Sequence, residues 1–273
     1  MKGKAPLRRT EDPMFSRPGE ENAAMAGIPG NVLVGRDQEL AALTQRLAGR
    51  HSLLLHGPAG VGKTALLRAV LPNHPEILYC PESSSKQTVF RALAAALAAR
   101  DRTAASVLGG PDGIKAKSAV SLKGIVQDRL RCGKYWVVLD HLRMPSQAFA
   151  ADIKDVAGWA TTPILGVARS HHMEDVGFLK SLFIDRSEKL ELRNFDDAQA
   201  ERFARQVVED SRLTATNMGE FLARVLQFSA GNPGAIIGMV NMAKLPKYRS
   251  GTQIMLSPLY IDYRLGSGVA TTR

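Results

Sequence analysis

One segment of the chain has residue types and spacing that suit phosphate chemistry. Residues 57–64 read Gly-Pro-Ala-Gly-Val-Gly-Lys-Thr and match the pattern GxxxxGK[ST] in full. Glycines let the backbone turn so that successive N–H groups point at phosphate oxygens, and the start of a following helix adds its positive dipole end. Lys63 would neutralise the β- and γ-phosphates of a nucleotide, and the Thr64 hydroxyl would bind Mg²⁺. The sequence therefore predicts a phosphate-binding loop (P-loop).

A second segment supplies a carboxylate for the same ion. Residues 135–140 read Tyr-Trp-Val-Val-Leu-Asp, an apolar strand that ends in Asp140, as is typical of a Walker B strand. Asp140 would hold Mg²⁺ through water. No Asn-Lys-x-Asp motif, which reads guanine, follows this strand. ATP is therefore favoured over GTP.

The elements that must position these residues alternate between strands and helices. Apolar runs predict strands at 51–56, 76–80, 135–140, 163–168 and 189–192. Helical periodicity predicts four helices between these strands. The first is capped by Asp37, the second covers 65–71 and is stopped by Pro72, and the others cover 85–100 and 118–131. Residues 109–111 break the chain between the last two. This order predicts an α/β fold with a parallel sheet covered on both faces.

The last third of the chain has a different pattern. Helices are predicted at 196–210, 218–228 and 233–243, and they would form a small helical subdomain. Apolar residues then alternate over 259–265, which suits an added edge strand or a packed extended hook. The predicted organisation is a flexible tail at 1–30, a P-loop α/β domain at 31–193, a helical lid at 194–245 and a basic tail at 246–273.

The charge and the composition limit the setting and the partners. Of the net charge of +10, residues 100–134 carry eight basic and three acidic side chains, and residues 244–273 carry five and one. Clustered Lys and Arg suggest nucleic acid as a partner, although a solvated basic surface explains them equally well. Cys80 and Cys132 fit buried thiols better than a disulfide framework. No apolar run reaches the roughly 20 residues of a membrane helix, and no secretory signal begins the chain, so we expect a soluble cytoplasmic protein without a membrane partner.

Taken in order, the motifs resemble the AAA+ and STAND superfamily of P-loop ATPases, most closely its initiator-like or transposon-regulator-like members. Four further segments carry the resemblance, which spans residues 31–243: Leu-Val-Gly-Arg-Asp-Gln-Glu-Leu at 33–40, residues 161–170, Leu-Phe-Ile-Asp-Arg-Ser-Glu at 182–188, and Gly-Asn-Pro-Gly-Ala-Ile at 231–236. The resemblance implies an adenine pocket formed in part by the first segment. It also implies a γ-phosphate sensor at Arg169, an arginine finger at Arg186 that acts on a neighbouring subunit, and a lid motif at Pro233.

One position departs from the pattern of the superfamily. The Walker B aspartate is usually followed by an acidic residue that activates the attacking water, and here His141 takes that place. A neutral histidine accepts a proton, but its reference pKa of about 6.5 differs from that of a carboxylate, so it would be a different kind of base. Glu82 lies just beyond the second strand, where some P-loop ATPases of the RecA type place their catalytic glutamate. The base is therefore His141 or Glu82, or the protein is a nucleotide switch that hydrolyses ATP slowly.

The leading prediction is an ATPase whose nucleotide sets the angle between sheet domain and lid, and so controls assembly or binding of DNA through residues 115–134 and the basic tail. A homo-oligomer would let Arg186 act in trans. The alternatives are a STAND-type signalling switch that binds protein and, less well supported, a small-molecule kinase. The predicted catalytic residues are Lys63, Asp140, Arg169, Glu82, His141 and Arg186, and the metal ligands are Thr64 and Asp140. The predicted nucleotide contacts are Val34, Gly35, Arg36, Gly57, Pro58, Ala59, Gly60, Val61, Gly62, Lys63, Thr64, Ala65 and Pro233.

Overall fold

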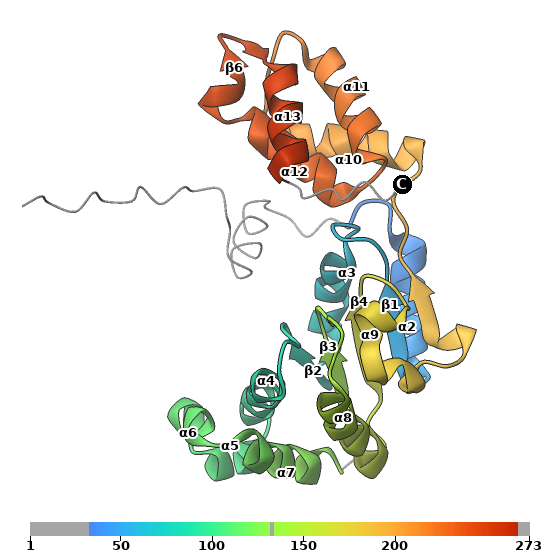
Figure 1. Ribbon diagram of the computed structural model, residues 1–273, viewed down its shortest axis with the longest axis vertical. Helices are drawn as coiled ribbons and strands as arrows, with labels where there is room; N and C mark the ends of the chain where they lie inside the picture. Colours follow the sequence, from blue (N-terminus) through green and yellow to red (C-terminus); the bar gives the residue numbers. More distant parts are fainter. Residues whose placement is uncertain (1–32, 132–133, 267–273) are drawn as a thin grey trace, which may run out of the picture. The chain divides into compact units, whose positions relative to one another are not determined.

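Five strands form one parallel sheet in the computed structural model, which describes residues 33–131 and 134–266 (Figure 1). The strands are β1 (Leu53–His56), β2 (Ile77–Cys80), β3 (Trp136–Leu139), β4 (Ile164–Ala168) and β5 (Lys189–Glu191). They lie in the order β2-β3-β4-β1-β5, and each neighbouring pair is parallel. The α/β class predicted from the alternation of strands and helices is confirmed.

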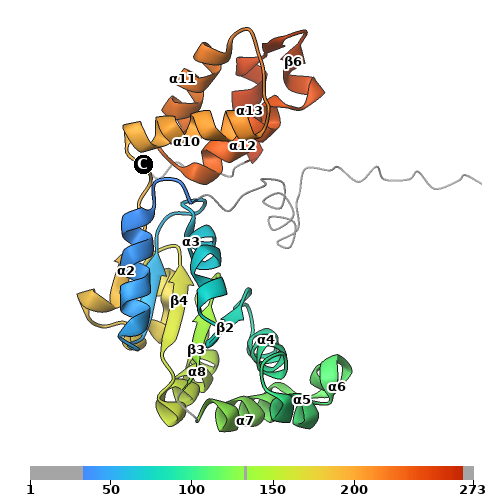
Figure 2. The same ribbon diagram turned by 180° about the vertical axis from the view of Figure 1, so that it is seen from behind.

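Helices cover both faces of this sheet because successive strand residues point to opposite sides. The helices around the sheet are α2 (Asp37–Ala48), α3 (Lys63–Val70), α4 (Lys86–Ala98), α5 (Arg102–Leu108), α6 (Gly110–Ala116), α7 (Ala119–Leu130), α8 (Gln147–Ala160) and α9 (Met173–Val176). Helices α2 and α3 lie together on one face (Figure 2). Leu53 and Leu55 of β1 pack with buried residues of both helices there. Leu54, between them, packs with α4, α7 and α8 on the other face. The P-loop follows β1, whose alternate residues enter the hydrophobic clusters on both faces.

Several helix starts agree with the sequence, and one does not. The Ser85 hydroxyl accepts the N–H of Thr88 at the start of α4, as an N-cap serine does. Asp37 was expected to cap the first helix but is already its first helical residue, and Arg36 is the N-cap without a side-chain bond. The chain turns one residue earlier than expected, at Gly35, whose φ is +72°. Helices α5, α6 and α8 were not predicted.

The described chain divides into two compact units. The core unit comprises residues 33–203 and 229–235, and the helical unit comprises residues 204–228 and 236–266. The remaining elements are α10 (Asp197–Asp210), α11 (Met218–Ser229), α12 (Pro233–Ala243), the short hairpin β6 (Arg249–Ser250) and β7 (Gln253–Ile254), and α13 (Leu256–Gly266). The three helices predicted after residue 193 are confirmed as α10, α11 and α12. The predicted tail at 1–30 and Cys132 lie outside the described residues.

The strand or hook predicted at 259–265 is wrong, because this segment is helix α13. Leu259 and Tyr260 are buried, whereas Ile261 and Leu265 are 59% and 76% exposed, so the apolar residues lie on both sides of the helix. That distribution produces an alternation that resembles a strand. Pro258 is tolerated because it lies in the first turn, where backbone N–H groups have no partner within the helix. Within the described ranges, no helix is long and apolar enough to cross a membrane.

Candidate active site

The P-loop joins β1 to α3, the context that its sequence predicted. Gly60 and Gly62 have φ values of +76° and +103°, which L side chains rarely adopt. A Cβ at Gly57 would lie 2.1 Å from the carbonyl oxygen of Leu192, so no side chain fits there. The turn places Lys63 at the first position of α3, where free N–H groups and the helix dipole favour an anion.

Lys63 lies across the mouth of the loop. Its Nζ donates to the carbonyl oxygens of Gly57 and Pro58 at 2.7 and 2.8 Å. Burial lowers the pKa of Lys63 to about 8, an effect that the carboxylate of Asp140 opposes and the charge of Arg169 strengthens. The ammonium is thus held by the loop that is to bind phosphate, with Asp140 and Arg169 close enough to affect its charge.

Asp140 follows β3 and is only 1% exposed. Its Oδ2 accepts the Thr64 hydroxyl at 3.1 Å and the Tyr79 hydroxyl at 2.8 Å, and its Oδ1 accepts the backbone N–H of His141 at 2.8 Å. The two predicted metal ligands are therefore adjacent. A carboxylate and a hydroxyl fit Mg²⁺, which commonly takes one or two protein oxygens and completes its shell with phosphate and water. The described residues contain no group of three or more His, Cys, Asp or Glu side chains that could hold a metal ion. A magnesium site of the kind predicted here does not require such a group.

The two candidate bases lie differently with respect to this pair. His141 has a left-handed φ of +56°, and its ring is 48% exposed with Nε2 3.8 Å from Asp140 Oδ2, which is beyond hydrogen-bond distance. Glu82 is exposed beyond β2, an edge strand that β3 and β4 separate from β1. In the described chain, no hydrogen bond or ion pair involves the Glu82 carboxylate. His141 is thus beside the Walker B aspartate, and the role of each residue stays a prediction.

The two arginines lie at opposite edges of the sheet. Arg169 follows β4, which lies between β3 and β1, so it is at the carboxyl edge together with Lys63 and Asp140. It is exposed, and among the described residues it has no hydrogen bond or ion pair. Arg186 lies in a short turn before β5, at the amino edge, because β5 runs parallel to β1. Arg186 therefore does not reach the P-loop of its own chain, and its role as a finger in trans stays a prediction.

The loop at residues 229–235 is bonded directly to the P-loop. Asn232 Nδ2 donates to the carbonyl oxygen of Ala59 at 2.9 Å, and the N–H of Gly234 donates to that of Gly60 at 2.9 Å. A Cβ on Gly234 would lie 2.8 Å from Gly60 Cα, so the two backbones meet without room for a side chain. The sequence indicated only Pro233 at this place. The closely spaced glycines on both sides of it were the available signal for a close backbone contact.

Arg36 lies beneath the P-loop rather than in an open pocket. The residue is 5% exposed, and its guanidinium donates to the carbonyl oxygens of Val61 at 3.2 Å and Arg193 at 2.7 Å. It also pairs with Glu39 at 2.7 Å and lies over the ring of Phe195 at 4.2 Å. Arg36 therefore joins the P-loop to the segment after β5. Contact with a nucleotide stays a prediction for all the residues named from the sequence, for the P-loop and Arg36 as much as for Val34, Gly35 and Pro233.

A row of three histidine rings lies next to the P-loop, and the contact of the first of them, His56, with His171 was not predicted from the sequence. His56, the last residue of β1, is 7% exposed, and its ring lies 5.0 Å from that of His171. The ring of His172 lies 4.3 Å from that of His171. Burial lowers the pKa of His56, and His171 and Lys63 act in the same direction while Glu191 opposes them. The row joins the end of β1 to the loop after β4 that carries Arg169.

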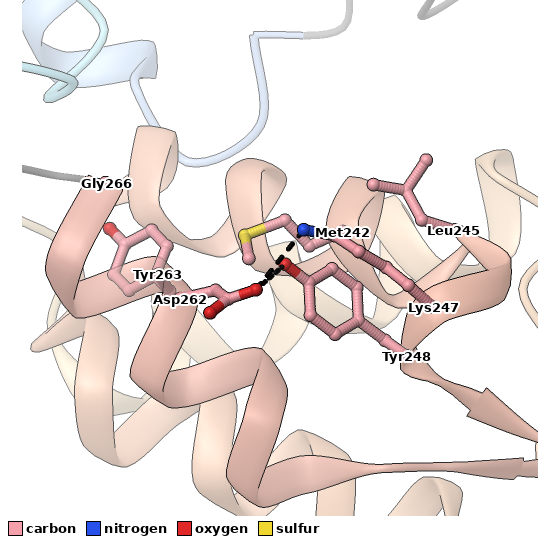
Figure 3. A pocket seen from close by; sticks show the side chains of 7 residues that line it. All are labelled: Met242, Leu245, Lys247, Tyr248, Asp262, Tyr263 and Gly266. Carbon is pink, nitrogen blue, oxygen red and sulfur yellow. Dashed lines mark hydrogen bonds and ion pairs between the residues drawn. The ribbon is translucent and has the colours of Figure 1, made fainter. Parts of the chain in front are cut away.

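Two cavities lie away from the P-loop. One, of about 250 Å³, is in the helical unit, and Figure 3 shows Tyr248 and Lys247 directed toward the Asp262 carboxylate that they bond. The other, of about 340 Å³, includes His51 and Ser52 before β1 and Glu188 before β5, so it lies at the amino edge of the sheet. No P-loop residue lines either cavity.

Comparisons with known proteins agree with this geometry. The family model described as AAA ATPase domain matches residues 32–228, and no curated protein matches the sequence. The structure of the Aeropyrum pernix ORC1 protein in complex with DNA is similar at a TM-score of 0.58 and 17% identity, over 89% of this chain and 68% of that one. Domain III of the Thermotoga maritima replication initiation protein DnaA gives a TM-score of 0.53 at 17% identity, over 85% and 95%.

A third solved structure, Drosophila ORC bound to DNA, gives a TM-score of 0.53 at 13% identity, over 89% of this chain and 64% of that one. At these identities the similarity concerns the fold, which in all three cases extends over most of the chain. The family model covers well over half of the sequence and includes the P-loop and Asp140. The chain therefore belongs to the AAA ATPase domain family, and it has the P-loop core of an AAA+ ATPase.

Proposed function

We propose that the chain binds ATP with Mg²⁺ at the P-loop and works as a nucleotide-dependent switch that hydrolyses ATP slowly. The observation that carries this proposal is the meeting of Thr64 and Asp140 at the end of the loop, at 3.1 Å. A hydroxyl and a buried carboxylate in contact beside a phosphate-binding turn suit a nucleotide-bound magnesium ion. The family match supports the same chemistry.

Each residue has a defined part in this account. The N–H groups of residues 57–64 would bind phosphate oxygens, and Lys63 would neutralise the β- and γ-phosphates. Thr64 and Asp140 would hold the ion, which supplies positive charge where negative charge develops. Arg169 lies at the same edge of the sheet. Its guanidinium has no hydrogen bond or ion pair with the residues that the structure describes, and it would contact the γ-phosphate.

We expect slow hydrolysis because the residue that follows Asp140 is a histidine. A carboxylate that activates water is the usual device in this superfamily, and His141 occupies its place with a half-exposed ring. A histidine that is open to solvent holds a water molecule less firmly than a buried group would, so we expect a lower rate of chemistry. A slow reaction suits a switch, because the bound state then persists long enough to be read by a partner.

The bonds between the P-loop and residues 229–235 support the switch. Asn232 and Gly234 bond Ala59 and Gly60, and α12 begins at Pro233 within the core unit and continues into the helical unit. A shift of the P-loop on binding phosphate would therefore move the start of this helix. ATP and ADP would favour different arrangements of the two units to the extent that they bind those arrangements with different affinity.

DNA is the partner that we propose for this switch. The proposal of DNA rests on residues 100–134, which have a net charge of +5. Some of this charge is offset locally, because Lys123 pairs with Asp152 and Asp155 at 2.7 Å and Arg129 with Asp101 at 3.8 Å. Two of the similar structures, ORC1 from Aeropyrum pernix and Drosophila ORC, are bound to DNA, and this supports DNA as the partner to propose here. Because Lys123 and Arg129 have acidic partners within the chain, fewer basic groups are left for phosphate, and a switch that binds protein is therefore the second candidate.

The test is steady-state ATP hydrolysis by the purified chain, with and without double-stranded DNA, together with equilibrium binding of ATP. Lys63→Ala should abolish both ATP binding and hydrolysis, because it removes the cation of the loop. The matched control is Lys180→Ala, which removes an exposed lysine elsewhere in the core unit and should leave both unchanged. Unaltered ATP affinity in Lys63→Ala would disprove the site assignment.

The same assay separates the two partners. DNA binding should stimulate hydrolysis, and its affinity should fall steeply with salt as counterions are released. ATP binding without any response to DNA would refute the DNA part of the proposal and favour the protein-binding switch.

A further inference from the structure

Tyr79 reaches the Walker B carboxylate from the neighbouring strand. It lies on β2 in register with Val138 of β3, two residues before Asp140. Its hydroxyl donates to Asp140 Oδ2 at 2.8 Å, a shorter bond than the 3.1 Å bond from Thr64 to the same oxygen. No motif in the sequence pointed to this residue, because the contact depends on the pairing of strands that are far apart along the chain.

The carboxylate of Asp140 depends on these donors for its orientation. It is 1% exposed, so it has little access to water and must be satisfied by protein groups. The backbone N–H of His141 fixes Oδ1, while Tyr79 and Thr64 share Oδ2. Thr64 is itself a proposed ligand of the ion. Tyr79 therefore differs from Thr64, because it donates to Asp140 without being a proposed ligand of the ion.

A buried tyrosine hydroxyl does not by itself require such a partner in this protein. Tyr260 in the helical unit is 8% exposed, and its hydroxyl has no hydrogen-bond partner among the described residues. Tyr79, by contrast, directs its hydroxyl at the buried carboxylate of Asp140.

We propose that Tyr79 is a positioning residue that holds the Asp140 carboxylate in the orientation that binds the magnesium ion of the bound nucleotide. This inference rests on the proposed function. Groups that bond a metal-binding carboxylate from behind set its direction and basicity, and their loss commonly costs about 10–100-fold in metal affinity or activity. Tyr79 should therefore affect the response to Mg²⁺ and leave the bonds between P-loop and phosphate intact.

The experiment compares the wild type with Tyr79→Phe, which keeps the ring and removes the hydroxyl. ATP binding is measured in EDTA and over a titration of Mg²⁺. We expect equal affinity in EDTA, and a rise of about 10–100-fold in the Mg²⁺ concentration that gives half of the full effect. Tyr260→Phe, which removes a buried hydroxyl without a partner, is the matched control and should behave as the wild type.

The outcomes separate this inference from the proposed function. If Tyr79→Phe binds ATP with the same Mg²⁺ midpoint as the wild type, the positioning role is wrong and the proposed function stands. If Tyr79→Phe loses affinity in EDTA as well, or its melting temperature falls far below that of Tyr260→Phe, Tyr79 is a structural residue and the inference is overturned. If the wild type does not bind ATP, or binds it without any effect of Mg²⁺, both the proposed function and the inference fail.

Discussion

Two charged side chains at the carboxyl edge of the sheet, Asp140 and Lys63, are held by specific neighbours. Asp140 accepts bonds from Thr64, Tyr79 and the backbone of His141, and Lys63 donates to two carbonyl oxygens of its own loop. Such bonds offset the cost of removing these groups from water. They also fix the groups in place before any ligand arrives, which is what a phosphate site requires.

His56 gives a prediction of how stability depends on pH. Its folded-state pKa lies below its ordinary value of about 6.5 because the ring is buried beside His171 and Lys63. Above about pH 6.5 the ring is neutral in both folded and unfolded chains. As the pH falls below that value, the unfolded chain takes up the proton first, so the free energy of unfolding should decrease.

Chemical denaturation of the wild type and His56→Gln between pH 7.5 and 5 measures this effect. The variant should lose stability less steeply, by up to about 1.4 kcal/mol per pH unit. His51→Gln, which replaces an exposed histidine before the same strand, is the control and should keep the slope of the wild type. Equal slopes for His56→Gln and the wild type would show that His56 does not contribute.

At this scale the sequence predicted the residues that belong to a contiguous motif and missed those that depend on packing. Lys63 and Thr64 lie within the P-loop pattern, and Asp140 is identified by its strand. Tyr79 takes part through strand pairing, which leaves no local pattern. Asn232 takes part through a loop contact, of which the glycines at 231 and 234 are the only local sign. Which residue activates water remains a prediction for the same reason, since it depends on geometry around the nucleotide.

Strands and helices were predictable where one periodicity dominated a segment. Strands β1 to β4 are short and fully or mostly buried, so each appears as an apolar run between turn residues. The edge strand β5 is partly exposed, and of its three residues only Leu190 is apolar. Helix α8 was missed although it has 14 residues and its buried Phe149, Ile153 and Val156 are spaced as on one face of a helix. Helix α13 was mistaken for a strand because apolar residues lie on its exposed side as well as on its buried side.

The start of α12 gives a prediction at the level of elements. Gly234 is the second residue of this helix, and alanine there would place its Cβ 2.8 Å from the Cα and 3.0 Å from the carbonyl oxygen of Gly60. Gly234→Ala should therefore push the loop off the P-loop, with a loss of about 1–3 kcal/mol in the free energy of unfolding and weaker ATP binding. Denaturation and nucleotide titration measure the two effects.

Gly219 provides a matched control because it is the second residue of α11 and its Cβ would meet no atom within 4 Å. Gly219→Ala should stabilise the chain by about 0.5–1 kcal/mol, the usual gain of alanine over glycine in a helix. If Gly234→Ala were as stable as Gly219→Ala and bound ATP normally, the contact with Gly60 would not matter for the site.

For the whole molecule, the central claim is that nucleotide in the core unit changes the arrangement of the core and helical units. The connection runs through the bonds of Asn232 and Gly234 to the P-loop and along α12, which belongs to both units. The net charge of +10 affects which partners approach. The net charge does not determine how the two units respond to the bound nucleotide. A measurement of the units themselves is therefore more direct than a binding assay with a partner.

That measurement is the distance between spin labels at Val120 in α7 and Ile261 in α13, which are 78% and 59% exposed. Both positions are replaced by cysteine in a Cys132→Ser chain, and the distance distribution is recorded with Mg²⁺ and either ADP or a non-hydrolysable ATP analogue. We predict different distributions for the two nucleotides, and one unchanged distribution for the same chain with Lys63→Ala. Identical distributions with both nucleotides, in a labelled chain shown to bind them, would contradict the switch.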